Sequence, residues 1–370
     1  MRYYLIAGEA SGDLHGSNLV KGLRAADPDA VFRYWGGDLM AAACGGQAPV
    51  VHYRDCAVMG ITDVVRKGVP LLRNLSRCKE DIRSWKPDVV IPIDYPGFNL
   101  KVARFCHESG IRVFYYIAPK TWASRPKRNR MLKAWVDRLF IVFPFEVPYF
   151  EKQGIPFTYK GNPLVDAVDG HEYERPCEGS YIALLPGSRK GEISRMMPVC
   201  MEAADRLGMK VLVAGAPSRT IEDYKPFIGE RDNVEVLFGR TYDILKYAAA
   251  AIINSGTASL EAALTGTPQV VCWSASRITY FVATKIFRVL DHVDYISLGN
   301  LCLGRPAFRE LIQDGFTPDA VAEEVRRLTD DADYRDKMIK DYSEIRQALG
   351  GRGASLAVAR EMIQEIRFAI

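Results

Sequence analysis

Short apolar runs alternate along most of this chain with longer segments in which apolar residues recur every three or four positions. The short runs have the length of β-strands, and the longer segments have the period of amphipathic helices. Such alternation predicts βαβ units around a parallel sheet. In the first part of the chain the predicted strands are Tyr3 to Ala7, Val89 to Ile93, Val113 to Ile117 and Leu139 to Phe143.

The same alternation restarts after the middle of the chain. Between the two series, the segment from Gly161 to Pro176 gathers Gly, Pro and Asp, which is typical of a connection between domains. We therefore expect an α/β protein with two Rossmann-like domains. The strands predicted for the second domain are Tyr181 to Leu185, Val211 to Ala214, Val234 to Leu237, Ala251 to Ile253 and Gln269 to Trp273.

Each half opens with a strand, a glycine-bearing turn and an amphipathic helix. In the first half, Gly8, Gly12 and Gly16 would let backbone N–H groups approach a ligand. In the second half, Gly187, Ser188 and Arg189 stand at a predicted helix start, where a cation and unpaired N–H donors favour an anion. The alternative is that these glycines only make tight turns, because neither loop matches a strict dinucleotide or P-loop pattern.

A third glycine-bearing turn begins another helix, in the sequence NSGTASLEAALTGTP. Ser255, Gly256 and Thr257 would provide a capping hydroxyl and free amides at the positive end of this helix, which suits a diphosphate. Glu261 follows Thr257 by one helical turn, so its carboxylate could accept hydrogen bonds from a ribose diol. An ordinary N-cap followed by a solvated Glu is the alternative.

Asp94 is the strongest candidate for a general base. It directly follows a wholly apolar strand, at the end of the strand where open α/β sheets bind ligands, and Asn99 is near enough to orient it or the substrate. Glu9 and Asp13 are rival bases, although Asp13 is better explained as a cap on its own helix. The alternative for Asp94 is a turn residue before Pro96.

Composition excludes several classes of protein. The 370 residues carry 49 Lys and Arg against 45 Asp and Glu, a net charge of +4, which argues against nucleic-acid binding. The eight cysteines form no CxxC and the five histidines no HExxH, so we expect neither disulfides nor a metal site. No apolar run is long enough to span a bilayer and no signal-peptide pattern opens the chain, which favours a cytoplasmic protein.

Three segments mix cations with large apolar side chains. This mixture suits an anionic bilayer surface or an acyl-chain substrate, and a solvated helix face is the alternative. In the first of them the apolar residues are Leu71, Leu72, Leu75 and Trp85. The segments are Val64 to Lys86, Arg125 to Arg138, and the run RITYFVATKIFRVL from Arg277.

Seven motifs together resemble the bacterial lipid-A-disaccharide synthases, in the same order and over nearly the whole chain. The resemblance implies a GT-B fold, with the two Rossmann-like domains facing each other across a cleft. It places the first domain at 1–165, with 346–370 crossing back onto it, and the second at 166–345. The motifs are AGEASGD (Ala7 to Asp13), AVMGI (Ala57 to Ile61), KPDVVIPIDYPGFN (Lys86 to Asn99), YYIAPKTWA (Tyr115 to Ala123), LLPGSR (Leu184 to Arg189), SGTASLE (Ser255 to Glu261) and DYISLGN (Asp294 to Asn300).

The resemblance also implies an activity. Members join UDP-2,3-diacylglucosamine to 2,3-diacylglucosamine 1-phosphate with inversion, without a metal or other cofactor, at the inner face of the cytoplasmic membrane. By motif, Asp94 is the base, Arg189 lies near the UDP phosphates, and Glu261 and Asn300 belong to the nucleotide site. The remaining candidate binding residues lie in the glycine-bearing turns and beside Asp94: Gly8, Glu9, Ser11, Gly12, Asn99, Gly187, Ser188, Ser255, Gly256 and Thr257.

Two other classes of protein stay open on the sequence alone. A UDP-N-acetylglucosamine 2-epimerase has the same two facing domains, but it needs no basic and apolar surfaces. A nucleotide-sensing peripheral membrane protein would keep Arg189 and Glu261 but would lose nothing on removal of Asp94. The expected partners are the two sugar substrates and an anionic membrane surface, with no nucleic acid, and a homodimer is left open.

Overall fold

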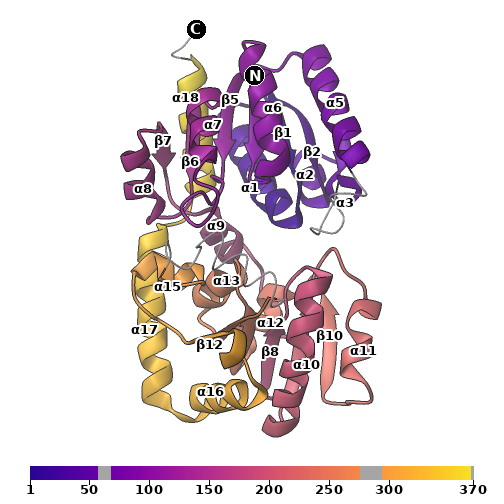
Figure 1. Cartoon of the computed structure of the whole chain (residues 1–370), viewed down its shortest axis with the longest axis vertical. Helices are drawn as coiled ribbons and strands as arrows, with labels where there is room; N and C mark the ends of the chain where they lie inside the picture. The colour runs from indigo at the N-terminus through magenta and orange to yellow at the C-terminus, as the bar shows by residue number, and fades with distance from the viewer. Residues whose placement is uncertain (57–67, 276–293, 368–370) are drawn as a thin grey trace. The chain divides into compact units, whose positions relative to one another are not determined.

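The computed structural model describes residues 1–56, 68–275 and 294–367, and the chain divides into two compact units (Figure 1). Unit 1 comprises Met1–Ala167 and Gly350–Ile370, and unit 2 comprises Val168–Leu349. Each unit contains one wholly parallel β-sheet, which confirms the predicted α/β class. The basic run from Arg277 falls outside the described residues.

The sheet of unit 1 has seven strands in the order β3-β2-β1-β4-β5-β6-β7. The central strands are apolar on both faces because helices cover both sides, as parallel sheets require. The strands are β1 (Arg2–Ala7), β2 (Val31–Gly36), β3 (Val51–His52), β4 (Val89–Ile93), β5 (Arg112–Tyr116), β6 (Arg138–Ile141) and β7 (Phe157–Tyr159).

The last helix of the chain, α18 (Ala354–Arg367), belongs to unit 1 and packs against its first helix, α1 (Ala10–Ala26). Arg112 in β5 donates to the carbonyls of Glu365 and Ile366 at distances of 3.1 and 3.2 Å, which fastens the end of α18 to the sheet. The other helices are α2 (Asp38–Ala43), α3 (Tyr53–Cys56), α5 (Gly68–Trp85), α6 (Pro96–Glu108), α7 (Arg128–Trp135), α8 (Glu146–Gln153) and α9 (Pro163–Asp169).

The sheet of unit 2 has six strands in the order β10-β9-β8-β11-β12-β13. They are β8 (Tyr181–Leu185), β9 (Lys210–Gly215), β10 (Val234–Phe238), β11 (Ala250–Asn254), β12 (Gln269–Trp273) and β13 (Glu310–Ile312). The helices are α10 (Lys190–Leu207), α11 (Lys225–Ile228), α12 (Thr241–Tyr247), α13 (Ala258–Thr265), α15 (Leu298–Leu303), α16 (Pro318–Asp330) and α17 (Ala332–Leu349), with short 3-10 turns at Ile221–Asp223 and Gln313–Gly315.

The predicted strands are confirmed with small changes at their ends. β5 ends at Tyr116 because Ile117 has a left-handed backbone, with φ of 61°. β6 ends at Ile141 because the next two backbone N–H groups, of Val142 and Phe143, donate to the Glu146 carboxylate instead of a strand. The prediction missed β2, β3, β7 and β13, of which the last three have only two or three residues.

Both sheets reverse their strand order at one point. In unit 1 this point lies between the neighbouring strands β1 and β4, and in unit 2 between β8 and β11. The loops that follow two such strands run to opposite sides and leave a crevice at the carboxyl edge, where ligands of open α/β sheets bind. The turns that carry Gly8, Asp94, Gly187 and Ser255 follow these four strands, whereas the candidate Asn300 lies in α15.

The first predicted membrane segment is only partly exposed. On α5, Leu72 is 60% exposed, whereas Leu75 is 9% exposed and packs in the core. Trp85 lies under the guanidinium of Arg2, whose Cζ is 4.6 Å from the centre of the ring. Leu75 is therefore not available to a membrane and Trp85 only in part, because one face of α5 is needed to cover the sheet.

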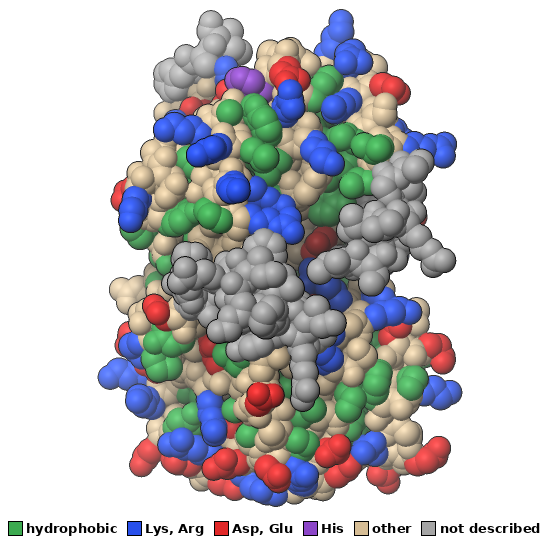
Figure 2. All heavy atoms as spheres, viewed as in Figure 1, with side chains coloured by type: hydrophobic (Ala, Val, Ile, Leu, Met, Phe, Trp, Pro, Cys, Tyr) green, Lys and Arg blue, Asp and Glu red, His purple; other side chains and the backbone are tan. Residues whose placement is uncertain are grey.

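The two units differ in charge. The 188 residues of unit 1 include 27 Lys and Arg against 18 Asp and Glu, whereas unit 2 has 22 against 27. Figure 2 shows Lys and Arg side chains spread over the visible face of unit 1, with few acidic side chains among them. No helix among the described residues is long and apolar enough to cross a membrane.

Candidate active site

Asp94 lies at the reversal point of the unit 1 sheet, directly after β4. Its backbone N–H donates to the Tyr116 carbonyl at 3.1 Å, so the loop after β5 begins beside it. Asp94 and Tyr95 both have left-handed backbones, with φ of 44° and 48°. Non-glycine residues in this region cost about 1 kcal/mol or more each and persist where the surroundings hold them, often at functional sites.

Two side chains hold the strained turn through the Asp94 carbonyl. Asn99, which is fully buried, donates to this oxygen at 2.7 Å, and the Tyr115 hydroxyl donates to it at 2.6 Å. Asn99 therefore holds the backbone of Asp94. Of the two roles proposed for Asn99, orienting Asp94 or orienting the substrate, this contact supports the first. These two bonds do not use the carboxylate of Asp94, which accepts the backbone N–H of Tyr95 just before α6 begins at Pro96.

Burial raises the pKa of the Asp94 carboxyl to about 6. The positive charges of Lys120 and Arg128 and the N–H of Tyr95 oppose this rise, and the negative charge of Glu9 adds to it. A base is most effective when its pKa lies near the working pH. The site therefore supplies a carboxylate that is ionised at neutral pH and more basic than an exposed aspartate.

The glycine-bearing turn after β1 serves packing as well as access. A Cβ on Gly8 would lie 2.4 Å from the Tyr95 ring, so only glycine lets this ring cover the turn. A Cβ on Gly12 would lie 3.2 Å from that of Ala7, which explains this glycine by the close approach of α1 to β1. Glu9 stands at the N-cap of α1 in extended backbone, and Ser11 is exposed in its first turn.

Asp13 caps a helix other than its own. Its buried carboxylate accepts hydrogen bonds from the backbone N–H groups of Gly37, Leu39 and Met40, at 2.7, 3.1 and 3.2 Å, and so caps the start of α2. The prediction that it caps α1 is wrong, because the side chain points across to the neighbouring loop. These contacts occupy the carboxylate, which removes Asp13 as a rival base.

In unit 2, the turn after β8 meets the turn after β11. Gly187 has φ of 101°, and a Cβ on it would lie 2.6 Å from the Asn254 side-chain nitrogen and 2.6 Å from a Glu192 carboxylate oxygen. Glycine is required here both by the backbone conformation and by the close approach of the two turns. The structure thus brings together the two loops that the sequence predicted to bind phosphates.

The start of α10 already holds an anionic group. The Glu192 carboxylate accepts the backbone N–H groups of Ser188 and Arg189, both at 3.1 Å, and pairs with the Arg189 guanidinium at 2.8 Å. The expectation of unpaired donors at this helix start is therefore wrong. A phosphate that binds here must take over these donors, and Glu192 would then have to turn away.

The hydroxyls after β11 differ from the prediction. Ser255 donates to the Ile296 carbonyl at 2.9 Å, and Thr257 stands at the N-cap of α13 without a side-chain capping bond. The predicted capping hydroxyl is therefore absent from this helix start in the described structure, because Ser255 ties the turn to a distant loop. Gly256 has space around it: the nearest atom that an added Cβ would meet is the Asn254 carbonyl oxygen, at 4.0 Å.

Glu261 lies in the first turn of α13, where its N–H donates to the Thr257 carbonyl at 3.2 Å. Burial raises the pKa of its carboxyl to about 7, and the hydroxyl of Tyr242 in α12 opposes the rise. The side chain of Glu261 is partly buried, so it differs from a fully solvated Glu. The carboxylate is suited to accept hydrogen bonds from a ligand that reaches it.

Asn300 is fully buried and its amide is used within the protein. It donates to the Phe308 carbonyl at 3.0 Å and to Glu310 at 2.9 Å, and it accepts from the Ala307 N–H at 2.8 Å. These bonds leave little of the Asn300 side chain for a ligand. We therefore expect Asn300 to stabilise the loop near the expected nucleotide site rather than to contact the nucleotide itself.

Glu310 is a residue that the sequence analysis missed. Its carboxylate accepts the N–H groups of Ile296 and Ser297, both at 3.0 Å, the Ser297 hydroxyl at 2.5 Å, and the Asn300 amide. It thereby fixes the segment whose Ile296 carbonyl receives the Ser255 hydroxyl. No sequence signal marks Glu310, because it stands 13 and 14 residues from two of its partners.

The matching family and two similar relatives carry the name of the same enzyme. The pattern of the lipid-A-disaccharide synthetase family matches residues 3–364. A lipid-A-disaccharide synthase of Geobacter metallireducens is 37% identical over 373 residues, 97% of this chain and 95% of the relative. One of Myxococcus xanthus is 37% identical over 377 residues, 98% of this chain and 97% of the relative.

A solved structure has a similar fold. The UDP-GlcNAc 2-epimerase from Neisseria meningitidis, bound to UDP-GlcNAc, gives a TM-score of 0.69 at 12% identity and covers 98% of this chain and 100% of its own. At this identity the likeness shows the fold alone.

Two Rossmann-like units with ligand loops at their reversal points define a protein of the GT-B class. Within that class the family match decides the activity, since it extends over nearly the whole chain. This chain belongs to the lipid-A-disaccharide synthase family and is a UDP-sugar glycosyltransferase of lipid A biosynthesis.

Proposed function

We propose that this chain transfers 2,3-diacylglucosamine from UDP to the 6-hydroxyl of 2,3-diacylglucosamine 1-phosphate, which gives a β-1,6-linked disaccharide 1-phosphate and UDP. The observation that carries the catalytic assignment is Asp94, a carboxylate with a pKa of about 6 on a strained turn at the reversal point of unit 1. The junction of the turns after β8 and β11 supports a site for the UDP diphosphate in unit 2.

In the proposed reaction, Asp94 accepts the proton of the acceptor hydroxyl while that oxygen attacks the anomeric carbon. The bond from this carbon to the UDP oxygen breaks as the new bond forms, so a single displacement inverts an α-linked donor to a β product. The negative charge that develops on UDP is stabilised by the Arg189 guanidinium and by the backbone N–H groups at the starts of α10 and α13. Glu261 would accept hydrogen bonds from the ribose hydroxyls.

The proposed mechanism needs no metal or other cofactor, because cations and helix dipoles of the chain stabilise the leaving group. We expect purified protein with UDP-diacylglucosamine and the monosaccharide 1-phosphate in neutral detergent to form disaccharide and release UDP. The rate should be the same with and without EDTA. Strict dependence on added magnesium would contradict the metal-free mechanism, whereas UDP-GlcNAc epimerisation without disaccharide formation would favour the epimerase alternative.

We also propose that unit 1 binds an anionic membrane surface at the cytoplasmic face, so that the enzyme meets its acylated substrates there. The excess of cations in unit 1 and the exposed Leu72, with the exposed Arg73 next to it, support this proposal. Each cation near an anionic surface contributes about 1 kcal/mol. Arg66 and Lys67, which stand before α5, belong to the same proposal from the sequence. A homodimer stays a prediction.

The membrane proposal predicts that replacement of Leu72 and Arg73 together by Ser weakens binding to anionic vesicles by about fivefold or more, because one cation and one apolar side chain are lost. Vesicle sedimentation measures this, and high salt should weaken the parent protein similarly. The matched control replaces Ile221, which is 43% exposed, and Lys225 of unit 2 by Ser. Equal losses in both variants, or in neither, would place the membrane contact elsewhere.

A further inference from the structure

The loop beside Asp94 carries four cations, Lys120, Arg125, Lys127 and Arg128, and three of them act electrostatically on Asp94 or on one another. We call Lys120, Arg125 and Arg128 the cationic cluster; the first two lie between β5 and α7, and the third is the first residue of α7. The backbone N–H of Asp94 donates to the Tyr116 carbonyl, so the first residues of this loop lie next to the proposed base. Lys120 and Arg128 are close enough to lower the pKa of Asp94, and Arg125 is close enough to lower that of Arg128.

Among the described residues, the cationic cluster lacks close partners, although Asp94 and Glu146 lie near enough to attract its charges. Within the described part of the chain, none of the three forms an ion pair or donates a side-chain hydrogen bond. Arg128 is half-buried, and burial lowers its pKa, so its charge is held at a cost. The mutual repulsion of Arg125 and Arg128 and the loss of water around Arg128 would both be relieved by a bound anion.

The loop that carries the cationic cluster is tied to the segment after β6. The Trp122 indole N–H donates to Glu146 at 3.1 Å, and its ring packs edge-on against Phe145 at a centroid distance of 4.8 Å. Glu146 is itself buried and also accepts the N–H groups at the end of β6. Because Trp122 ties the loop to Phe145 and Glu146, less ordering would be needed when an anion binds.

We propose that the cationic cluster binds the phosphate monoester of the acceptor sugar. The inference rests on the proposed function and extends it, since no candidate residue above was assigned to this phosphate. The cluster lies in the same unit as Asp94, whereas the turns suited to the UDP diphosphate lie in unit 2. The 1-phosphate and the 6-hydroxyl belong to one sugar ring, so a phosphate held on this loop orients the hydroxyl toward Asp94.

The test compares two acceptors on parent and variant proteins. Diacylglucosamine 1-phosphate and the same sugar without phosphate are supplied in neutral detergent at about pH 8, where Asp94 is ionised in every variant. We expect loss of the phosphate to lower kcat/KM of the parent about 100-fold. Lys120→Gln and Arg128→Gln should each lower kcat/KM for the phosphorylated acceptor about 10-fold or more, because each removes one charge-assisted contact. For the acceptor without phosphate, kcat/KM of each variant should stay within about twofold of the parental value.

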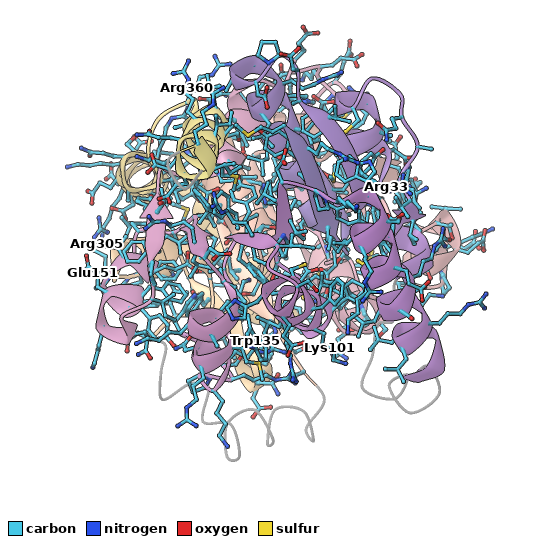
Figure 3. All side chains as sticks on the ribbon, turned by 90° about the horizontal axis from the view of Figure 1, so that it is seen from above. Arg33, Lys101, Trp135, Glu151, Arg305 and Arg360 are labelled. Carbon is cyan, nitrogen blue, oxygen red and sulfur yellow. The ribbon has the colours of Figure 1, made fainter. Side chains whose placement is uncertain are left out.

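Lys101→Gln is the matched control. Lys101 is an exposed cation on α6, which packs against α7, and Figure 3 shows it on the same side of unit 1 as Trp135 at the end of α7. Lys101→Gln removes one positive charge from the same region without changing the cluster. The variant should therefore turn over both acceptors at the parental rates. Lys120 is exposed, so its variant should melt at the parental temperature.

The outcomes separate the inference from the function on which it rests. Equal losses for the two acceptors would overturn the inference, because the cations would then act on Asp94 or on the loop. Release of Lys120→Gln from anionic vesicles, with detergent kinetics unchanged, would also overturn it and assign the cluster to lipid headgroups. If the parent turns over neither acceptor, the proposed function fails. Equilibrium binding of the two acceptors without donor then still decides whether the cluster recognises the phosphate.

Discussion

Replacement of Asp94 by Asn should lower the rate of disaccharide formation by about 10² to 10⁴-fold while the protein still folds and binds UDP. An amide has nearly the same shape as the carboxylate but cannot accept the proton of the attacking hydroxyl, and this range is typical of the loss of a general base. The turn itself should survive, because Asn99 and Tyr115 hold the backbone carbonyl of residue 94 and not its side chain. Steady-state kinetics with saturating donor measure the effect.

The pH dependence of the parent checks the same assignment. Because the base acts in its ionised form and burial raises the pKa of Asp94 to about 6, kcat/KM should rise with pH through about 6 and then level off. Asp29→Asn, which changes an exposed turn aspartate of the same unit, is the control and should leave the profile unchanged. Near-parental turnover of Asp94→Asn would rule out Asp94 as the base, and a large loss of thermal stability would favour the turn interpretation.

The sequence predicted the strands that carry the site because of how parallel sheets are buried. β4, β8 and β12 are covered on both faces, so they read as continuous apolar runs, and their predicted bounds are those observed. β2 was missed because its exposed start and its arginine interrupt such a run, although its last three residues are buried. Edge strands of two or three residues carry too short a pattern to be seen.

Site residues could be predicted from the sequence where they directly follow a strand, because the carboxyl ends of parallel strands are where ligands bind. Asp94 directly follows a strand, and the turns at Gly187 and Ser255 also directly follow strands. The acidic residues that organise the site were not predictable, since their roles depend on contacts that no local pattern encodes. Glu192 reads as a polar position on an amphipathic helix, yet it occupies the donors at the start of α10. Glu310 reads as an ordinary surface charge, yet it holds the loop that contacts Ser255.

Replacement of Arg189 by Ala should weaken UDP binding by about tenfold and lower kcat by about 10²-fold. A cation beside a diphosphate binds it in the ground state and binds it more strongly as negative charge develops on the leaving group. Isothermal titration with UDP and steady-state kinetics measure the two effects. Arg206→Ala, at the other end of α10, is the control and should change neither.

The contact with Glu192 sharpens the expectation for Arg189→Lys. The Arg189 guanidinium pairs with Glu192, which also accepts two backbone N–H groups, so UDP binding at this helix start must exchange this carboxylate for phosphate. Lysine offers one compact charge where arginine can contact two oxygens, so it should restore only part of the affinity and rate. Full rescue by lysine would contradict a forked contact. Glu192→Gln should bind UDP more tightly than the parent, because a neutral amide competes less well for the same donors, and unchanged affinity would show that the phosphates bind elsewhere.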